Sequence, residues 1–291
     1  MKICFEKNKN TDYHIQCVDY DSPLWAEYQG AYGNVVDNIR MLMGDQDIVP
    51  QQRINRLAHD LKSDRDVILE NLFENLWHQM SFYDATYLAM PYLVQLLEQR
   101  EKANDFIGQF HLIVGIGACL MTDIAVNHHQ SIAHQEILQS YNQSILVIQE
   151  KTKVFFERYH EQLQKQSEDD KQQFCLALLA ILGDREIAYL LISVMFDECY
   201  VLCQECGYCD EEIESLSEEI PDNIVPAPSV IGQWDGSSLD DVYVWFSNVL
   251  ALFNQDKAVK NFSYYYGTYT CPECGTKGVV IDLMKNYFFE L

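Results

Sequence analysis

Apolar side chains recur at helical spacing over most of the chain between residues 22 and 197. Breaks with capping residues separate the periodic stretches. The pattern predicts helices over residues 22–44, 51–62, 64–76, 84–100, 105–121, 132–165, 171–182 and 185–196. Because helices joined by short breaks pack as antiparallel neighbours, we expect an all-α stack of helical hairpins, an α-solenoid.

The pattern changes near Cys199. Residues 220–238 are rich in Pro and Gly, as loops are, and 239–253 again have helical spacing. Residues 262–289 contain tyrosine, threonine and valine runs on both sides of a cysteine turn, which predicts strand, turn and strand. We therefore expect a helical domain over 1–197 and a small zinc-ribbon-like module with a β-hairpin over 198–291. One continuous domain is the alternative.

Two Cys-x-x-Cys-Gly units lie in this module and bracket a long acidic stretch. The first pair is Cys203 and Cys206, and the second is Cys271 and Cys274. Two such pairs can supply the four thiolates of a closed tetrahedral zinc site, which has no open position for water or substrate. The sequence therefore predicts a structural zinc ion. Cys209 offers an alternative first pair with Cys206, but only Cys203/Cys206 reproduces the Cys-Gly ending of the second unit.

The charge of the chain is strongly negative, with 20 basic and 44 acidic residues. Between Glu186 and Asp256 there are 15 Asp and Glu and no Lys, Arg or His. Such a field repels nucleic acid and anionic membrane and attracts basic proteins. A solvated acidic loop is the alternative, since most charge runs are solvated. The residues predicted to bind a partner are Asp210, Glu211, Glu212, Glu214, Glu218, Glu219, Trp234 and Trp245.

The two tryptophans enter that prediction because aromatic side chains among acids are typical of an interface core. The alternative is that they cover the zinc module. The first residues turn charged before an apolar core can form, so we expect no signal peptide, and no window is apolar enough for a membrane span. Clustered cysteines without a leader favour metal binding in a reducing cytosol, so we expect a cytoplasmic protein.

Neither the histidines nor any known catalytic motif indicates an active site in this sequence, so we expect that the protein is not an enzyme. His128, His129 and His134 follow one another in a predicted loop without an acidic or cysteine partner at matching spacing. His78 lies in a predicted corner, where we expect it to hold the turn by hydrogen bonds. The chain has no phosphate-binding glycine loop, no Gly-x-Ser-x-Gly and no His-Glu-x-x-His.

Two segments carry a resemblance to a known group. Ala31-Tyr32-Gly33 is followed by Asp37, and Leu76-Trp77-His78-Gln79 leads into 83–97, with Pro91 before Tyr-Leu-Val-Gln-Leu-Leu. These segments resemble a widespread group of bacterial HEAT-like proteins, several of which carry Cys-x-x-Cys-Gly units near the C-terminus. The chain departs from that pattern at Ile39, where the group has Pro, and at Met80, where it has Gly.

Many proteins of that group are presumed immunity proteins, because their genes lie beside toxin genes. The resemblance therefore implies a protein that neutralises a cognate bacterial toxin, and the acidic charge of the chain favours a basic nuclease as that toxin. The alternatives are a HEAT adaptor or scaffold with another partner and, less favoured, a HEAT-built DNA-acting enzyme such as a glycosylase. A DNA-acting enzyme needs a basic face, and this composition is the opposite.

Overall fold

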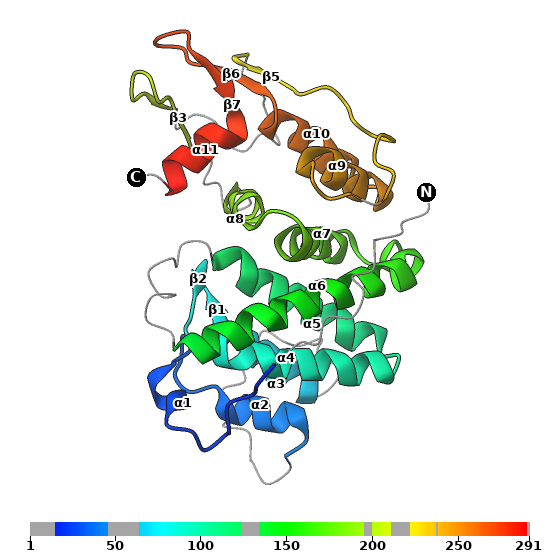
Figure 1. Cartoon of the computed structure of the whole chain (residues 1–291). Helices are drawn as coiled ribbons and strands as arrows, with labels where there is room; N and C mark the ends of the chain where they lie inside the picture. The colour runs from blue at the N-terminus through cyan, green and yellow to red at the C-terminus, as the bar shows by residue number, and fades with distance from the viewer. Residues whose placement is uncertain are drawn as a thin grey trace. The chain divides into compact units, whose positions relative to one another are not determined.

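The computed structural model describes residues 15–45, 64–123, 134–194, 200–210, 222–236 and 238–289. The described chain is mostly helical and forms two compact units (Figure 1). The N-terminal unit comprises the described residues up to Thr152, and the C-terminal unit those from Lys153 onward. This division falls within one helix, α6. The boundary at 197/198 that the change of sequence character predicts stays a prediction.

The described part of the N-terminal unit is built from helices and one β-hairpin, whose two strands have two residues each. Consecutive helices pack as pairs, α2 with α3 and α4 with α5, as the pattern predicts. The elements are α1 (Leu24–Glu27), α2 (Val36–Met43), α3 (Asp64–Leu76), β1 (Trp77–His78), β2 (Ser81–Phe82), α4 (Ala85–Lys102), α5 (Phe106–Thr122) and the first part of α6 (Gln135–Leu163).

The single helix predicted over 22–44 is wrong: the structure has two short helices there. A turn separates α1 from α2, and in it Gly30 and Gly33 exchange backbone hydrogen bonds of 2.8 and 3.2 Å. Gly33 has a φ of 110°, which a right-handed helix cannot contain. The predicted stop at Gly44 is confirmed, since it ends α2 with a φ of 105°. The helix predicted over 51–62 lies outside the described residues.

Helices α4 and α5 form the core of this unit. Helix α4 continues through Pro91, with its residues from Ala85 to Leu97 buried except Gln95. Asp105 caps α5 by accepting a hydrogen bond from the Gly108 N–H. A Cβ on Gly115 would overlap the ring of Phe73 on α3, so this glycine permits a close approach of α5 to α3.

The C-terminal unit combines helices with two small antiparallel sheets. Helix α7 packs on α8, and α9 on α10. The elements are α6 from Lys153 on, α7 (Glu168–Leu182), α8 (Arg185–Val194), β3 (Val201–Leu202), β4 (Cys209–Asp210), β5 (Ile224–Val225), α9 (Val242–Leu252), α10 (Asp256–Tyr265), β6 (Thr268–Thr270), β7 (Lys277–Val279) and α11 (Val280–Phe289).

The predicted hairpin of α7 and α8 is confirmed. Ser167 caps α7, the helix ends at Gly183, and Asp184 accepts from the Ile187 N–H at the start of α8. A Cβ on Gly183 would lie 2.8 Å from the ring of Trp245, so the turn needs glycine for space. This contact fixes the hairpin against α9.

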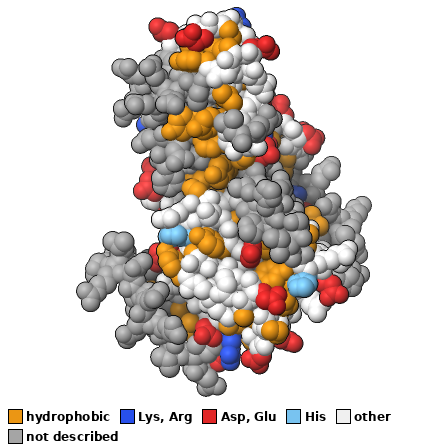
Figure 2. All heavy atoms as spheres, turned by 90° about the vertical axis from the view of Figure 1, so that its left-hand side faces the viewer, with side chains coloured by type: hydrophobic (Ala, Val, Ile, Leu, Met, Phe, Trp, Pro, Cys, Tyr) orange, Lys and Arg blue, Asp and Glu red, His pale blue; other side chains and the backbone are white. Residues whose placement is uncertain are grey.

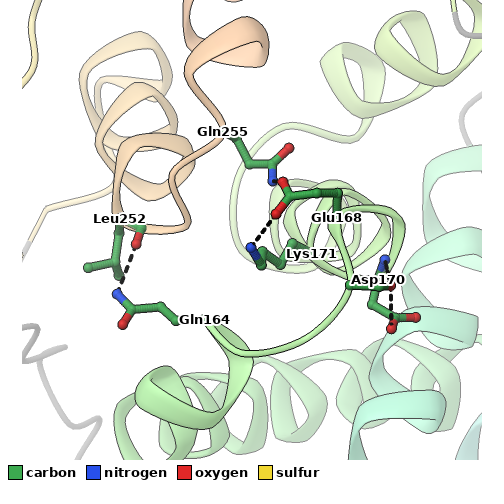
Figure 3. Close-up of polar contacts among 7 residues, drawn as sticks. Gln164, Glu168, Asp170, Lys171, Leu252 and Gln255 are labelled. Carbon is green, nitrogen blue, oxygen red and sulfur yellow. Dashed lines mark hydrogen bonds and ion pairs between the residues drawn. The ribbon is translucent and has the colours of Figure 1, made fainter.

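Polar contacts join the α6–α7 turn to the α9–α10 turn within this unit (Figure 3). Gln164 Nε2 donates to the Leu252 carbonyl at 2.9 Å, and Gln255 Nε2 donates to Glu168 Oε2 at 2.6 Å. The buried Lys171 ammonium lies 2.6 Å from Glu168 Oε1. Hydrogen bonds from Lys171 and then Gln255 hold the pKa of Glu168 below its usual range. The two turns are therefore linked by two hydrogen bonds, one of which is accepted by the Glu168 carboxylate.

The strand-like reading of 262–289 is only partly right. Strands occupy residues 268–270 and 277–279, while 262–265 end helix α10 and 280–289 form helix α11. Val280, Ile281 and Met284 are buried at helical spacing, so α11 begins where the sequence suggested a continuing strand. In addition, β5 pairs with β6 to give a three-stranded sheet in the order β5-β6-β7.

Candidate metal centre

Two hairpins carry the two cysteine pairs, and their turns have the same backbone. In the first turn, Gly207 N donates to the Cys203 carbonyl at 2.9 Å. In the second, Gly275 N donates to the Cys271 carbonyl, also at 2.9 Å. The φ angles of the two glycines are 72° and 74°, in the region where glycine is favoured. Each Cys-x-x-Cys-Gly unit therefore folds its two sulfurs to one side of a tight turn.

The two turns face each other and bring four sulfurs together. Cys203 Sγ lies 3.6 Å from Cys274 Sγ, and Cys206 Sγ lies 3.7 Å from Cys271 Sγ. All four ligand atoms lie within 4.8 Å of one another. Zinc–thiolate bonds of about 2.3 Å in a tetrahedron place sulfurs about 3.8 Å apart. The residues therefore fit one tetrahedral metal ion, and these separations are too long for a disulfide.

The surroundings of the four thiols alternate along the chain. Cys203 and Cys271 are buried, whereas Cys206 and Cys274 are exposed. The side-chain hydroxyl and backbone of Thr276 lower the pKa of Cys274 to about 6. The Tyr208 backbone lowers the pKa of Cys206, but desolvation and the other thiols outweigh it and raise that pKa to about 12. Four thiolates this close together therefore need a cation to ionise together.

A metal bound here would have protein sulfur at all four positions. Cys203, Cys206, Cys271 and Cys274 would hold it, and a closed thiolate set supplies structural cross-linking and no site for a substrate. The described residues contain no other group of three or more His, Cys, Asp or Glu placed to hold a metal. This cluster is therefore the candidate site of the described chain.

Cys17, Cys119 and Cys175 behave as packing residues. Cys119 and Cys175 are buried, and desolvation raises the pKa of each thiol. Cys17 is half-buried, and desolvation raises its pKa to about 11. The backbone of Cys209 lies in β4 opposite Leu202. The structure thus brings together the four cysteines of the preferred pairing.

Sequence reasoning missed Thr276 as a neighbour of the metal centre. Its hydroxyl oxygen lies 3.3 Å from Cys274 Sγ. A threonine two residues after a cysteine carries no local signal, because the contact exists only once the turn has folded. Tyr208 occupies the equivalent position in the first unit.

The predicted acidic partner-binding segment lies largely outside the described residues. Residues 211–221 are not described, so Glu211, Glu212, Glu214, Glu218 and Glu219 are not placed, and only the backbone of Asp210 is. Other acids of the same stretch are exposed: Glu205, Asp222, Asp235, Asp240, Asp241 and Asp256. Figure 2 likewise shows acidic side chains recurring over one face, with basic ones sparse. The described part of this stretch is therefore acidic at its surface.

Trp234 and Trp245 are core residues and not surface anchors. Their exposed fractions are 6% and 1%, and their rings pack edge to face at 6.4 Å. Trp234 Nε1 donates to the Ser238 carbonyl at 2.7 Å. Large aromatic rings stabilise a small unit most when they are buried, and the helical stripe of α9 turns Trp245 inward. The prediction that they form the centre of an interface is corrected accordingly.

The structure describes two of the histidines named above, His78 and His134. His78 lies in the β1–β2 corner, and Nε2 is 3.0 Å from the Tyr32 hydroxyl. His134 is exposed, its backbone N–H donating to the Tyr28 hydroxyl. His128 and His129 lie outside the described residues. The corner therefore connects two segments that the sequence singled out separately.

The chain matches no protein-family model, no curated protein and no solved structure. Among the described helices, none has the length and apolar content needed to cross a bilayer.

Proposed function

We propose that this chain is a protein-binding protein without catalytic activity, whose C-terminal acidic segment is held by a structural zinc ion and receives a basic protein partner. The observation that carries the proposal is the cluster of four cysteines. Zinc at this cluster would join the β3–β4 hairpin to the β6–β7 hairpin. Everything between the two hairpins is thereby constrained at both ends.

The constraint acts directly on the acidic segment. The acidic segment follows Asp210, the last residue of β4, and ends just before Ile224, the first residue of β5. Strand β4 pairs with β3 next to Cys203, and β5 pairs with β6 next to Cys271. A segment with fixed ends loses less conformational freedom on binding than one with free ends.

The charge of this region selects the class of partner. Acidic groups on a fixed mount accelerate association with a basic surface and disfavour nucleic acid as a ligand. A nuclease has a basic groove for phosphate, and an acidic inhibitor seated there would block its substrate. Together with the resemblance to HEAT-like immunity proteins, this supports neutralisation of a cognate bacterial toxin in the cytoplasm.

The same proposal extends to the architecture. The helical pairs α2/α3, α4/α5 and α7/α8 are the kind of unit that HEAT-like arrays repeat. We propose that they belong to such a stack, with the zinc-ribbon-like module at its C-terminal end. Fold alone does not decide function, so the binding experiment is the critical one.

The experiment co-expresses the chain with a candidate toxin, the product of the gene next to its own, and measures cell growth and the rate of complex formation. We expect growth rescue. We also expect about tenfold slower association at low salt when the four acids at the start of the segment are neutralised, with a smaller change in dissociation. The test variant changes Asp210→Asn, Glu211→Gln, Glu212→Gln and Glu214→Gln.

A matched control neutralises four acids on helices α4, α6 and α7. Its substitutions are Glu98→Gln, Glu136→Gln, Glu161→Gln and Asp169→Asn. Equal slowing by both variants would show a general charge effect and contradict a role for the segment. No rescue by the unmodified chain would contradict the toxin assignment and favour the adaptor.

A further inference from the structure

The aromatic side chain of Tyr32 is exposed to solvent. Its exposed fraction is 57%, and among the exposed large hydrophobic residues of the described chain it alone is aromatic. It lies between α1 and α2, in the N-terminal unit. The zinc-stapled segment belongs to the other unit.

The backbone around Tyr32 is fixed on the C-terminal end of α3. Tyr32 N donates to Asn75 Oδ1 at 3.0 Å, and Ala31 N donates to the Asn75 carbonyl at 2.8 Å. A Cβ on Gly30 would come within 2.8 Å of that same carbonyl oxygen. The turn therefore lies directly on the helix and leaves Tyr32 little backbone freedom.

The side chain is fixed as well. The Tyr32 hydroxyl lies 3.0 Å from His78 Nε2, with the rings edge to face at 5.1 Å. His78 precedes Gln79 and Met80, whose φ angles of 49° and 59° are uncommon for residues other than glycine. Backbone of this kind persists where surrounding contacts impose it, and it is often found at binding sites.

Acidic side chains lead up to this tyrosine. Glu74 Oε2 lies 3.4 Å from His78 Nδ1 and is 49% exposed. Asp66, Glu70 and Glu74 are spaced by four residues and so share one face of α3. We name these three acids the α3 stripe. An exposed aromatic ring therefore stands at the end of a row of carboxylates.

The bases described near the α3 stripe are already engaged. Arg40 pairs with Asp45 at 2.7 Å, and Arg65 Nη2 donates to the Leu42 carbonyl at 2.7 Å. Among the described residues, 15–45 and 64–83 contain 9 acidic and 2 basic residues, a difference of −7. This surface is therefore complementary to a positively charged partner.

We propose that Tyr32 and the α3 stripe form a second docking surface, which binds an arginine-bearing segment of a basic protein. A guanidinium group can stack on the Tyr32 ring while it pairs with Glu74, and further basic residues can follow the stripe. Arginine is favoured over lysine because its planar group stacks on aromatic faces and is less strongly hydrated. A ring held in place before binding loses little side-chain entropy on binding.

The test measures binding of the full, zinc-loaded chain to two labelled peptides by fluorescence anisotropy at low salt. One peptide alternates arginine with glycine over eight residues, and the other replaces each arginine with lysine. We expect tighter binding of the arginine peptide. Tyr32→Ala should weaken that binding about twofold to fivefold, while Tyr32→Phe keeps most of it because the ring remains.

Two controls separate this surface from general attraction. Ile107 is exposed to 48% on α5 of the same unit, and Ile107→Ala should leave both affinities unchanged. Glu74→Gln should weaken binding and flatten its salt dependence. The variant of the acidic segment should retain the full effect of Tyr32→Ala, so the two proposals can fail separately.

Any of three results would overturn the inference. These are no measurable binding of the arginine peptide, equal affinity for the two peptides, or an unchanged affinity in Tyr32→Ala. Circular dichroism and zinc content should match the unmodified chain in each variant, because Tyr32 is exposed. If Tyr32→Ala is misfolded by these measures, Tyr32→Ser and Glu74→Gln are compared in its place, and unchanged affinity in both contradicts the proposal.

Discussion

The two cysteine turns have one backbone and two different settings. Both have the same internal hydrogen bond of 2.9 Å, a glycine φ near the same value, and one buried and one exposed cysteine. Strands β6 and β7, which flank the second turn, belong to a three-stranded sheet. Strands β3 and β4, which flank the first turn, form a sheet of two strands in the described chain. The five-residue motif thus sets the turn, while distant segments set how strongly it is held.

Metal removal should give the largest difference between the two turns. Zinc binding at such a site contributes about 10–16 kcal/mol, and two paired strands support the first turn where three paired strands support the second. After chelation, we expect the amide hydrogens of Cys203 and Gly207 to exchange faster than those of Cys271 and Gly275. Hydrogen–deuterium exchange of the full chain measures this, and equal exchange at both turns would contradict the difference in support.

Cysteine variants check the metal itself. Cys203→Ser should lose about one zinc ion per chain, while Cys119→Ser, a buried cysteine on α5, should keep it. Metal analysis of protein purified without chelator decides this. Full zinc in Cys203→Ser together with loss in Cys209→Ser would show that the other pairing is used.

Glycine variants should sharpen the similarity of the two turns. A Cβ on Gly207 or Gly275 meets no atom within 4 Å, so replacement by alanine adds backbone strain and no clash. We expect Gly207→Ala and Gly275→Ala each to weaken zinc binding by about 1–2 kcal/mol, the usual cost of the left-handed conformation. Competition with a chromogenic chelator measures the affinity. A much larger loss at one turn would show that its backbone is additionally constrained.

The smallest effect concerns Thr276, which distinguishes the turns chemically. In the metal-free protein its contacts lower the pKa of Cys274 from 9.0 to about 6. This ionisation therefore stabilises the fold fully above pH 9, and the contribution disappears as the pH falls to about 6. Thr276→Ala should move the appearance of thiolate absorbance to higher pH, and Thr276→Ser should not. An unchanged profile in Thr276→Ala would mean that the hydroxyl has no influence.

Local patterns predicted the parts of this molecule that depend on short sequence distances. The cysteine pairs, the stop at Gly44 and the α7–α8 turn at Gly183 each follow from a few adjacent residues. Helix α3 follows from its apolar periodicity, and helix α5 follows from its long apolar run. These features need no knowledge of distant contacts.

Features that depend on distant partners could not be predicted in this way. Strand β5 has two residues and exists because Ile224 pairs with Tyr269, far along the chain. Trp234 and Trp245 lie among acids in sequence, and only packing shows that their rings face inward. The contact of Tyr32 with His78 likewise joins two motifs that are 46 residues apart.

The separation of the two cysteine pairs has a consequence for synthesis of the protein. Cys203 and Cys274 are 71 residues apart, so a ribosome adding about 5–20 residues per second needs roughly 4–14 s to make the second pair after the first. During that interval the first pair offers a metal only two of its four sulfurs. Closure of the site is therefore a late event, and until then the nascent chain exposes thiols that oxidants or competing metals can reach.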